Sequence, residues 1–223
     1  MIEQDVVLSD YAIATLALVL TVLVLRAPAG NRAARGWLTA VFAGAAAAAL
    51  LGGTVHGFLN LDRTSLFHFI AWRATLISVG VTALGGWGFG AALVLAPPNA
   101  RRLTWLAGLA FVIYCGIVLF VSQQYRIAIL HYLPSALFVL FSFGWLALKR
   151  RSWPIFAGFS GVLLSFAAAA VQQLQISLHP VYLSHNTLYH LVQILGLVLI
   201  FYGGRRALGP TRPEAPPGGG KSL

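Results

Sequence analysis

Long apolar stretches, separated by short polar connections, dominate the pattern of this chain. A helix needs about 20 apolar residues to cross the hydrocarbon core of a bilayer. Stretches that approach or exceed this length are Val6–Leu25, Trp37–Leu59, Leu66–Leu95, Leu103–Val121, Ile127–Leu148, Trp153–Ile176 and His185–Tyr202. The pattern predicts an all-α, polytopic membrane protein: a seven-transmembrane-helix bundle over residues 1–207, followed by a disordered Pro/Gly-rich cytoplasmic tail over residues 208–223.

The basic residues that flank these stretches are distributed unequally between the two sides of the predicted bundle. One side receives Arg26, Arg32, Arg35, Arg101, Arg102, Lys149, Arg150, Arg151, Arg205 and Arg206. The opposite side receives Arg63 and Arg126, with Arg73 near a helix end. Because cytoplasmic loops carry an excess of Lys and Arg, we predict an amino terminus outside and a carboxyl terminus inside, in a multi-pass protein of a bacterial inner membrane.

The composition agrees with the membrane class and narrows the function. Only 9% of the 223 residues are charged, whereas soluble domains have about 25%. The net charge of +10 lies in short clusters between apolar stretches, so we expect membrane lipids as partners and no nucleic acid. The single cysteine, Cys115, excludes an intrachain disulfide. The only lysines, Lys149 and Lys221, lie outside the last apolar stretch, which excludes a retinal Schiff base in that helix.

Polar side chains with useful chemistry collect at the outer ends of the predicted helices and in the outer loops. They include His56, His68, His131, His179, His185, His190, Asp10, Asn60, Asp62, Gln172, Gln173, Asn186 and Gln193. Polar residues at membrane depth are costly, and they usually face the bundle interior or a water-filled cavity. Histidine and glutamine are also stable in the headgroup zone without any special partner. The clustering predicts a polar site near the extracytoplasmic face.

Helical spacing selects particular residues within this set. In the last helix, Asn186, His190 and Gln193 follow the i, i+4, i+7 spacing of one face. His185 is five residues before His190, which places it about 140° away on an ideal helix. In the second helix, His56 shares a face with Asn60.

These residues suit a zinc site. A catalytic zinc ion takes three protein ligands and keeps one position open, where a water molecule becomes a usable nucleophile near neutral pH. The candidate ligands are His56, His185 and His190. We expect Asp62 to orient or deprotonate the water, with His68 and Asp10 as further candidates for the ligand set.

The arrangement resembles the superfamily of alkaline ceramidases and adiponectin- or progestin-type seven-helix receptors. The residues that carry the resemblance are the segment Gly52-Gly53-Thr54-Val55-His56, then Asp62, and the segment from Ser184 to His190. The chain differs at two positions, since Gly52 stands where that superfamily has serine and Asn186 where it has histidine. The resemblance implies seven helices around a zinc ion that hydrolyses a lipid amide or a related bond.

The leading hypothesis is therefore a zinc-dependent membrane hydrolase that acts on a lipid amide or ester. Two alternatives remain open. One is an electron-transfer protein in which His56 and His190, or His68 and His131, bind haem or copper. The other is a non-catalytic transporter, sensor or assembly protein.

Overall fold

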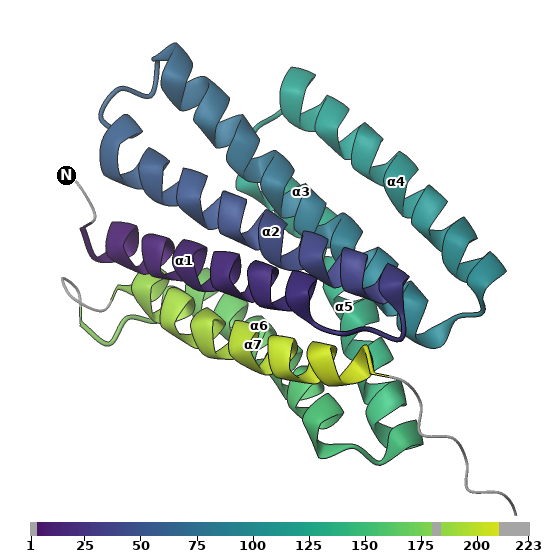
Figure 1. Ribbon diagram of the computed structural model, residues 1–223. Coiled ribbons are helices and arrows are strands. Elements are labelled where there is room, and N and C mark those ends of the chain that lie inside the picture. The colour runs from purple at the N-terminus through teal and green to yellow at the C-terminus, as the bar shows by residue number, and fades with distance from the viewer. Residues whose placement is uncertain (1–3, 180–183, 210–223) are drawn as a thin grey trace, which may run out of the picture.

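The computed structural model describes residues 4–179 and 184–209, and its elements are helices (Figure 1). They are α1 (Gln4–Arg26), α2 (Arg32–Thr54), the π-helix η1 (Val55–Leu59), α3 (Leu66–Val94), α4 (Pro97–Phe120), α5 (Tyr125–Arg150), α6 (Trp153–Gln173) and α7 (His185–Ala207). In the described part of the chain, 7 helices are long and apolar enough to cross a membrane, with η1 continuing α2. The prediction of an all-α protein with seven such helices is confirmed.

Two helices begin earlier than the apolar pattern predicts, because local capping residues extend them. The Asn31 side chain accepts a hydrogen bond from Ala34 N at 3.0 Å, and α2 therefore begins at Arg32. Pro97 and Pro98 occupy the first positions of α4, where the missing N–H costs nothing and the fixed φ favours the helix. Both extensions bring arginines of the connections into regular helix.

Six of the helices form a ring, and α4 stands outside it. Around the ring the packing order is α1, α2, α3, α5, α6 and α7, and α7 returns to contact α1. The main packing partner of α4 is α3, and Figure 1 shows α4 at the outer edge of the bundle. The ring can therefore enclose a site to which α4 contributes no wall.

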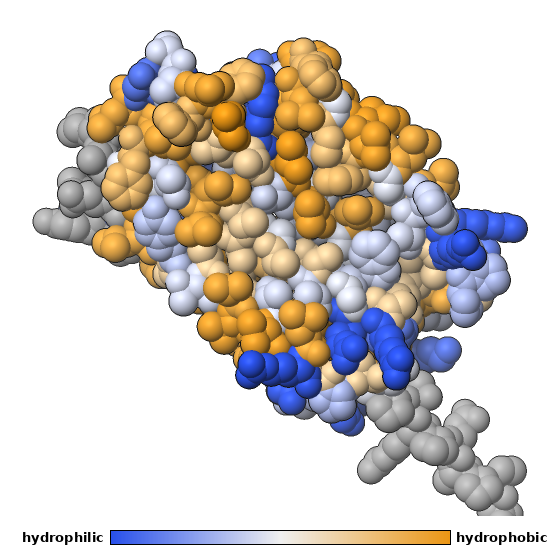
Figure 2. Space-filling view, turned by 45° about the horizontal axis from the view of Figure 1, so that its top comes forward, coloured by the Kyte–Doolittle hydropathy of each residue, from blue (hydrophilic) through white to orange (hydrophobic). Residues whose placement is uncertain are grey.

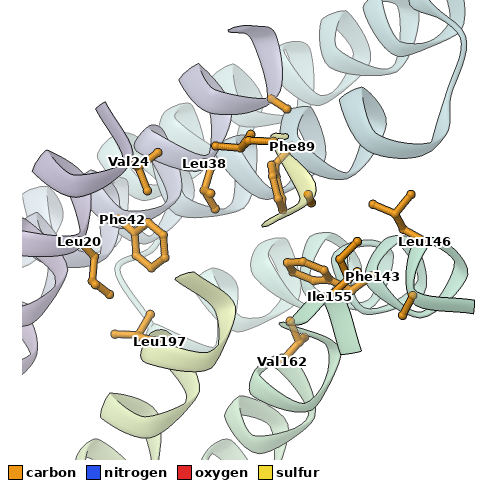
Figure 3. Packing of buried hydrophobic residues seen from close by; sticks show 14 of the residues in the cluster. Leu20, Val24, Leu38, Phe42, Phe89, Phe143, Leu146, Ile155, Val162 and Leu197 are labelled. Atoms are coloured by element: carbon orange, nitrogen blue, oxygen red, sulfur yellow. The ribbon is translucent and has the colours of Figure 1, made fainter. Parts of the chain in front are cut away.

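The bundle has two chemically different ends, which we name here. The polar end is where α1, α3, α5 and α7 begin, and the basic end is where these four helices finish. A core cluster built by all six ring helices fills the half toward the basic end (Figure 3). Its larger members are Leu20, Val24, Leu38, Phe42, Phe89, Phe143, Leu146, Ile155, Val162 and Leu197. Apolar packing thus closes the basic half of the ring.

The packed part of the chain extends one residue past the predicted boundary at 207. Leu208 is fully buried, and its carbonyl oxygen accepts a hydrogen bond from Gly30 N at 3.0 Å. This contact ties the end of α7 to the connection between α1 and α2. The rest of the predicted tail falls largely on positions 210–223, which lie outside the described residues.

The outer surface of the bundle is apolar over most of the face seen in Figure 2, with several of its most hydrophilic residues gathered where α7 finishes. On α4, large apolar side chains are well exposed, including Trp105, Leu109 and Val112. Such a surface suits contact with lipid tails rather than with water.

Candidate intramembrane site

A cavity of about 440 Å³ lies inside the ring, with residues of all six ring helices and of η1 in its wall and none from α4. Most of its lining is apolar, and the polar lining residues concentrate toward the polar end. Among them are Asp10, His56, Tyr125, Tyr132, Gln172, Gln173, Asn186, Tyr189, His190 and Gln193. Ligand sites are typically apolar cavities of this size range with a few convergent polar groups.

The polar centre of the cavity wall is a buried pair, Asp10 on α1 and His190 on α7. Their Oδ1 and Nε2 atoms are 3.3 Å apart, and the exposed fractions of the two side chains are 9% and 10%. Asp10 lies six residues beyond Gln4, which places it about 9 Å along the helix from the start of α1. The other ring nitrogen, His190 Nδ1, lies 2.7 Å from Ser9 Oγ. The imidazole of His190 is thus held between two consecutive residues of α1.

The hydrogen bonds around Ser9 favour one tautomer of His190. A hydroxyl has one hydrogen to donate, and the carbonyl oxygen of Val6, which can only accept, lies 2.9 Å from Ser9 Oγ. With that hydrogen bond in place, Ser9 Oγ accepts from His190 Nδ1–H, and Nε2 faces the Asp10 carboxyl group as an acceptor. In this arrangement a proton or a metal cation lies between Asp10 and His190.

His56 reaches the same cavity from η1, the turn of π-helix that ends α2. Single π-turns are rare and occur frequently at functional sites, because the extra residue rotates the side chains that follow. The imidazoles of His56 and His190 lie near enough to interact electrostatically. The second helix therefore contributes an imidazole to the wall that carries Asp10 and His190.

Close packing between α1 and α2 fixes how Asp10 lies relative to this wall. A Cβ atom added at Gly53 would lie 2.9 Å from the Cβ of Asp10 and 3.4 Å from the ring of Tyr11. One turn further, a Cβ at Gly57 would lie 3.1 Å from the side chain of Val7. These glycines let α1 approach the end of α2 closely, so they position the Asp10 carboxyl group.

Neutral amides extend the polar wall around α7. Gln193 Nε2 donates to Ser165 Oγ at 3.2 Å, and Gln172 Nε2 donates to Asn186 Oδ1 at the same distance. Both contacts join α6 to α7. Each amide that takes part keeps further donor or acceptor capacity for a ligand.

The first turn of α7 is fixed by a cap that also binds α1. The Ser184 side chain accepts from Thr187 N, and the hydroxyls of Ser184 and Thr187 both donate to Asp5 Oδ2 at 2.7 Å. Asp5 lies five residues before Asp10 on α1. These hydrogen bonds fix the register of α7 against α1 and so the height of His190 opposite Asp10.

Five of the residues selected from the sequence line this one cavity. They are Asp10, His56, Asn186, His190 and Gln193. The structure thus brings together the predicted face of the last helix, His56 of the second helix and Asp10 of the first.

Four other candidates lie outside the cavity lining: Asn60, Asp62, His68 and His185. Asp62 is in the connection between η1 and α3, exposed, and accepts hydrogen bonds from the Thr64 hydroxyl at 2.6 Å and from Thr64 N at 3.0 Å. These hydrogen bonds hold the pKa of the Asp62 carboxyl below its usual range. His185 opens α7, one residue out of register with the face that carries His190. Roles for Asp62 and His185 in chemistry at the cavity therefore find no support in their positions.

The side chains that could coordinate a metal ion are only partly brought together in the structure. Across the described residues, no three side chains of His, Cys, Asp or Glu lie together in a group that could hold a metal ion. Asp10 and His190 form a pair, and His56 stands separately on the wall of the same cavity. Zinc at His56, His185 and His190 stays a prediction, and of these three residues only His56 and His190 line the cavity.

A family model described as a family of unknown function, DUF6962, matches residues 6–208. The chain belongs to this family. No curated protein and no solved structure matches it. The matched segment contains all seven long helices except the first residues of α1, and it includes both Asp10 and His190. The resemblance to the alkaline ceramidases and the seven-helix receptors stays a prediction.

Sequence reasoning missed several residues of the site. Ser9 precedes a candidate carboxylate, but a serine within an apolar helix gives no signal of its own. Tyr125, Tyr132 and Tyr189 give no signal in the sequence either, since tyrosine near a helix end is typical of the membrane interface. Only the packing of the ring brings these residues of α5 and α7 to the lining of one cavity.

Proposed function

We propose that the chain spans a bacterial inner membrane with its amino terminus outside, so that the polar end of the bundle is extracytoplasmic. The apolar outer surface supports membrane insertion. The orientation follows from the arginines that gather at the basic end, since Lys and Arg are retained on the cytoplasmic side. The candidate site then lies within the membrane, close to the extracytoplasmic face.

We further propose that this site is the active site of a zinc-dependent hydrolase of lipid amides or esters. The observation that carries the proposal is the buried Asp10–His190 pair, with Oδ1 and Nε2 3.3 Å apart, on the wall of a cavity inside the helix bundle. Ionisable residues within a membrane are costly and usually functional. A pair that shares a positive charge suits a metal ion or a transferable proton.

The spacing of the pair is compatible with zinc. Two ligands of a tetrahedral zinc ion, each about 2.0–2.2 Å from the metal, lie about 3.3–3.5 Å apart. The Ser9 hydroxyl acts as the outer partner that fixes the tautomer of a histidine ligand. His56 would supply the third protein ligand from η1. A zinc ion bound by these residues supplies a water nucleophile that is usable near neutral pH.

Other groups that line the cavity can transfer a proton and bind the apolar part of a substrate. The Asp10 oxygen that is not on the metal can take a proton from the zinc-bound water and pass it to a leaving amine or alcohol. The apolar wall, which reaches Phe89 on α3 and Ile200 on α7, suits an alkyl chain. A substrate with one polar carbonyl group and a long apolar chain matches both parts.

Metal content of the detergent-purified full chain tests the proposal. We expect about one zinc ion per chain, lost in Asp10→Asn, His56→Ala and His190→Ala. The matched controls are Asp62→Asn and His185→Ala, which remove the same chemical groups outside the cavity lining and should keep the metal.

Retention of helical circular dichroism and of a single gel-filtration peak shows that each variant is folded. Absence of zinc from the folded wild type would overturn the metal-dependent function. Loss of zinc in His185→Ala, but not in Asp10→Asn, would instead favour the ligand set that the sequence predicts.

A further inference from the structure

Three tyrosines line the cavity together with Asp10, and the chemistry of the Asp10–His190 pair does not use them. Tyr125 and Tyr132 come from α5, and Tyr189 comes from α7. Tyr125 and Tyr132 are seven residues apart, which places them on one face of α5, two turns from each other. The three phenols and the Asp10 carboxyl group thus share one cavity.

The hydroxyl groups of these tyrosines have no hydrogen-bond partner among the described residues. Two other tyrosines of the bundle do have one, since Tyr114 donates to the carbonyl oxygen of Leu76 at 2.7 Å and Tyr11 pairs with the Thr54 hydroxyl at 3.2 Å. Half-buried tyrosine hydroxyls usually find a partner. Three unpartnered donors on one cavity wall therefore indicate a ligand that carries a hydrogen-bond acceptor.

The charge of the cavity wall limits what that acceptor is. No lysine or arginine is among the residues that line the cavity in the described part of the chain. A buried phosphate or carboxylate needs a cationic partner to offset its desolvation, and the proposed zinc ion, with Asp10 among its ligands and the attacking water in its open position, leaves none for a charged head group. A carbonyl oxygen is uncharged, and neutral phenol donors suit it.

We propose that Tyr125, Tyr132 and Tyr189 bind the carbonyl oxygen of the substrate and stabilise the negative charge that develops on it during hydrolysis. The inference rests on the proposed function and specifies its substrate as an uncharged amide or ester. In that reaction water adds to the carbonyl carbon, and the π electron pair of the C=O bond moves onto the oxygen. The three hydroxyls donate to this oxygen, whose hydrogen bonds strengthen as its charge grows.

The second half of the reaction returns that electron pair. The C=O bond re-forms and the bond from carbon to the amine or alcohol breaks, with the electron pair leaving on nitrogen or oxygen. The oxygen of Asp10 that is not on the zinc ion would receive the proton lost by the attacking water and deliver it to this leaving group. The products are a carboxylic acid and a free amine or alcohol.

Infrared spectroscopy of a bound probe tests the assignment without relying on turnover. The probe is hexadecanamide labelled with ¹³C at the carbonyl carbon, added to the purified full chain in detergent. Donors at the oxygen shift the carbonyl band to lower wavenumber. We expect this shift in the wild type, and a partial return of the band in Tyr125→Phe, Tyr132→Phe and Tyr189→Phe.

Each of these substitutions should also weaken binding about threefold to tenfold, which corresponds to one neutral hydrogen bond. The matched control is Tyr202→Phe, an exposed tyrosine of α7 that does not line the cavity; it should keep both the band and the affinity. Hexadecyl phosphate, which has the same chain and a charged head, should compete poorly with the amide.

Three outcomes would overturn the inference: failure of the amide to bind the wild type, an unchanged carbonyl band in all three cavity variants, or tighter binding of hexadecyl phosphate. Failure of the hydrolase function is distinguishable from these. If the folded protein lacked zinc and did not hydrolyse the amide, but the band shifted and responded to the three substitutions, the carbonyl site would stand and the proposed reaction would fall.

Discussion

The substitution Gly53→Ala perturbs the position of Asp10 without changing any polar group. The added Cβ would lie 2.9 Å from the Cβ of Asp10, a distance that real Cβ atoms essentially never show. Relief to an ordinary contact of 3.4 Å requires α1 to move by about 0.5 Å. Alanine at Gly52 provides the control, because its Cβ would meet only the Thr75 methyl group at 3.8 Å.

The expected magnitude follows from this displacement. Overpacking of a close contact costs about 1–3 kcal/mol of stability, so Gly53→Ala should lower the free energy of unfolding by an amount in that range. The same movement separates Asp10 from His190. Loss of supporting geometry at metal sites lowers affinity about 10–100-fold, and we expect zinc affinity to fall within that range while Gly52→Ala keeps it.

Zinc affinity is measured by competition with a chromophoric chelator, and stability by thermal unfolding followed with gel filtration. An unchanged zinc affinity in Gly53→Ala would refute the argument that the approach of α1 to α2 positions Asp10. Equal losses in Gly52→Ala and Gly53→Ala would also refute it, because the loss would then not depend on the contact with Asp10.

Two further predictions concern parts of the bundle outside the cavity. In a Cys115→Ser background, a membrane-impermeant thiol reagent should label Arg63→Cys on intact cells and should label Lys149→Cys only after the membrane is opened; the reverse pattern would contradict the proposed orientation. His131 stacks on Tyr114 at 4.2 Å with its buried Nε2 lacking a partner among the described residues. His131→Phe keeps the stacked ring and removes that nitrogen, so it should raise stability by roughly 1–3 kcal/mol in thermal unfolding, and a lower stability would mean that Nε2 has a function.

The sequence predicts the seven helices well, because each is marked by a stretch of about 20 mainly apolar residues. A bilayer requires that length however the helices pack against one another. The face of the last helix was also predictable, since helical spacing alone groups Asn186, His190 and Gln193. The partner of His190 was not, because Asp10 lies 180 residues away and only the packing of α1 against α7 brings them together. Asp62 is close to His56 in the sequence, but it lies in an exposed connection outside the cavity lining.

The local backbone geometry of η1 is a second feature of the site that the sequence does not predict. Periodicity assumes 3.6 residues per turn, and η1 departs from that value at Val55–Leu59. The departure decides which way His56 and Asn60 point: the first lines the cavity and the second does not. A face deduced from ideal spacing holds only as far as the α-helix continues.

The contact between α1 and α7 has a consequence for how the protein is made. Helices enter the membrane in the order of synthesis, so Asp10 arrives with the first helix and His190 with the last. Until then the carboxyl group lacks its partner at membrane depth, where an unpaired charge is costly. The ribosome has almost finished the chain before the site exists, and a nascent protein truncated after α6 carries an incomplete ring and no working centre.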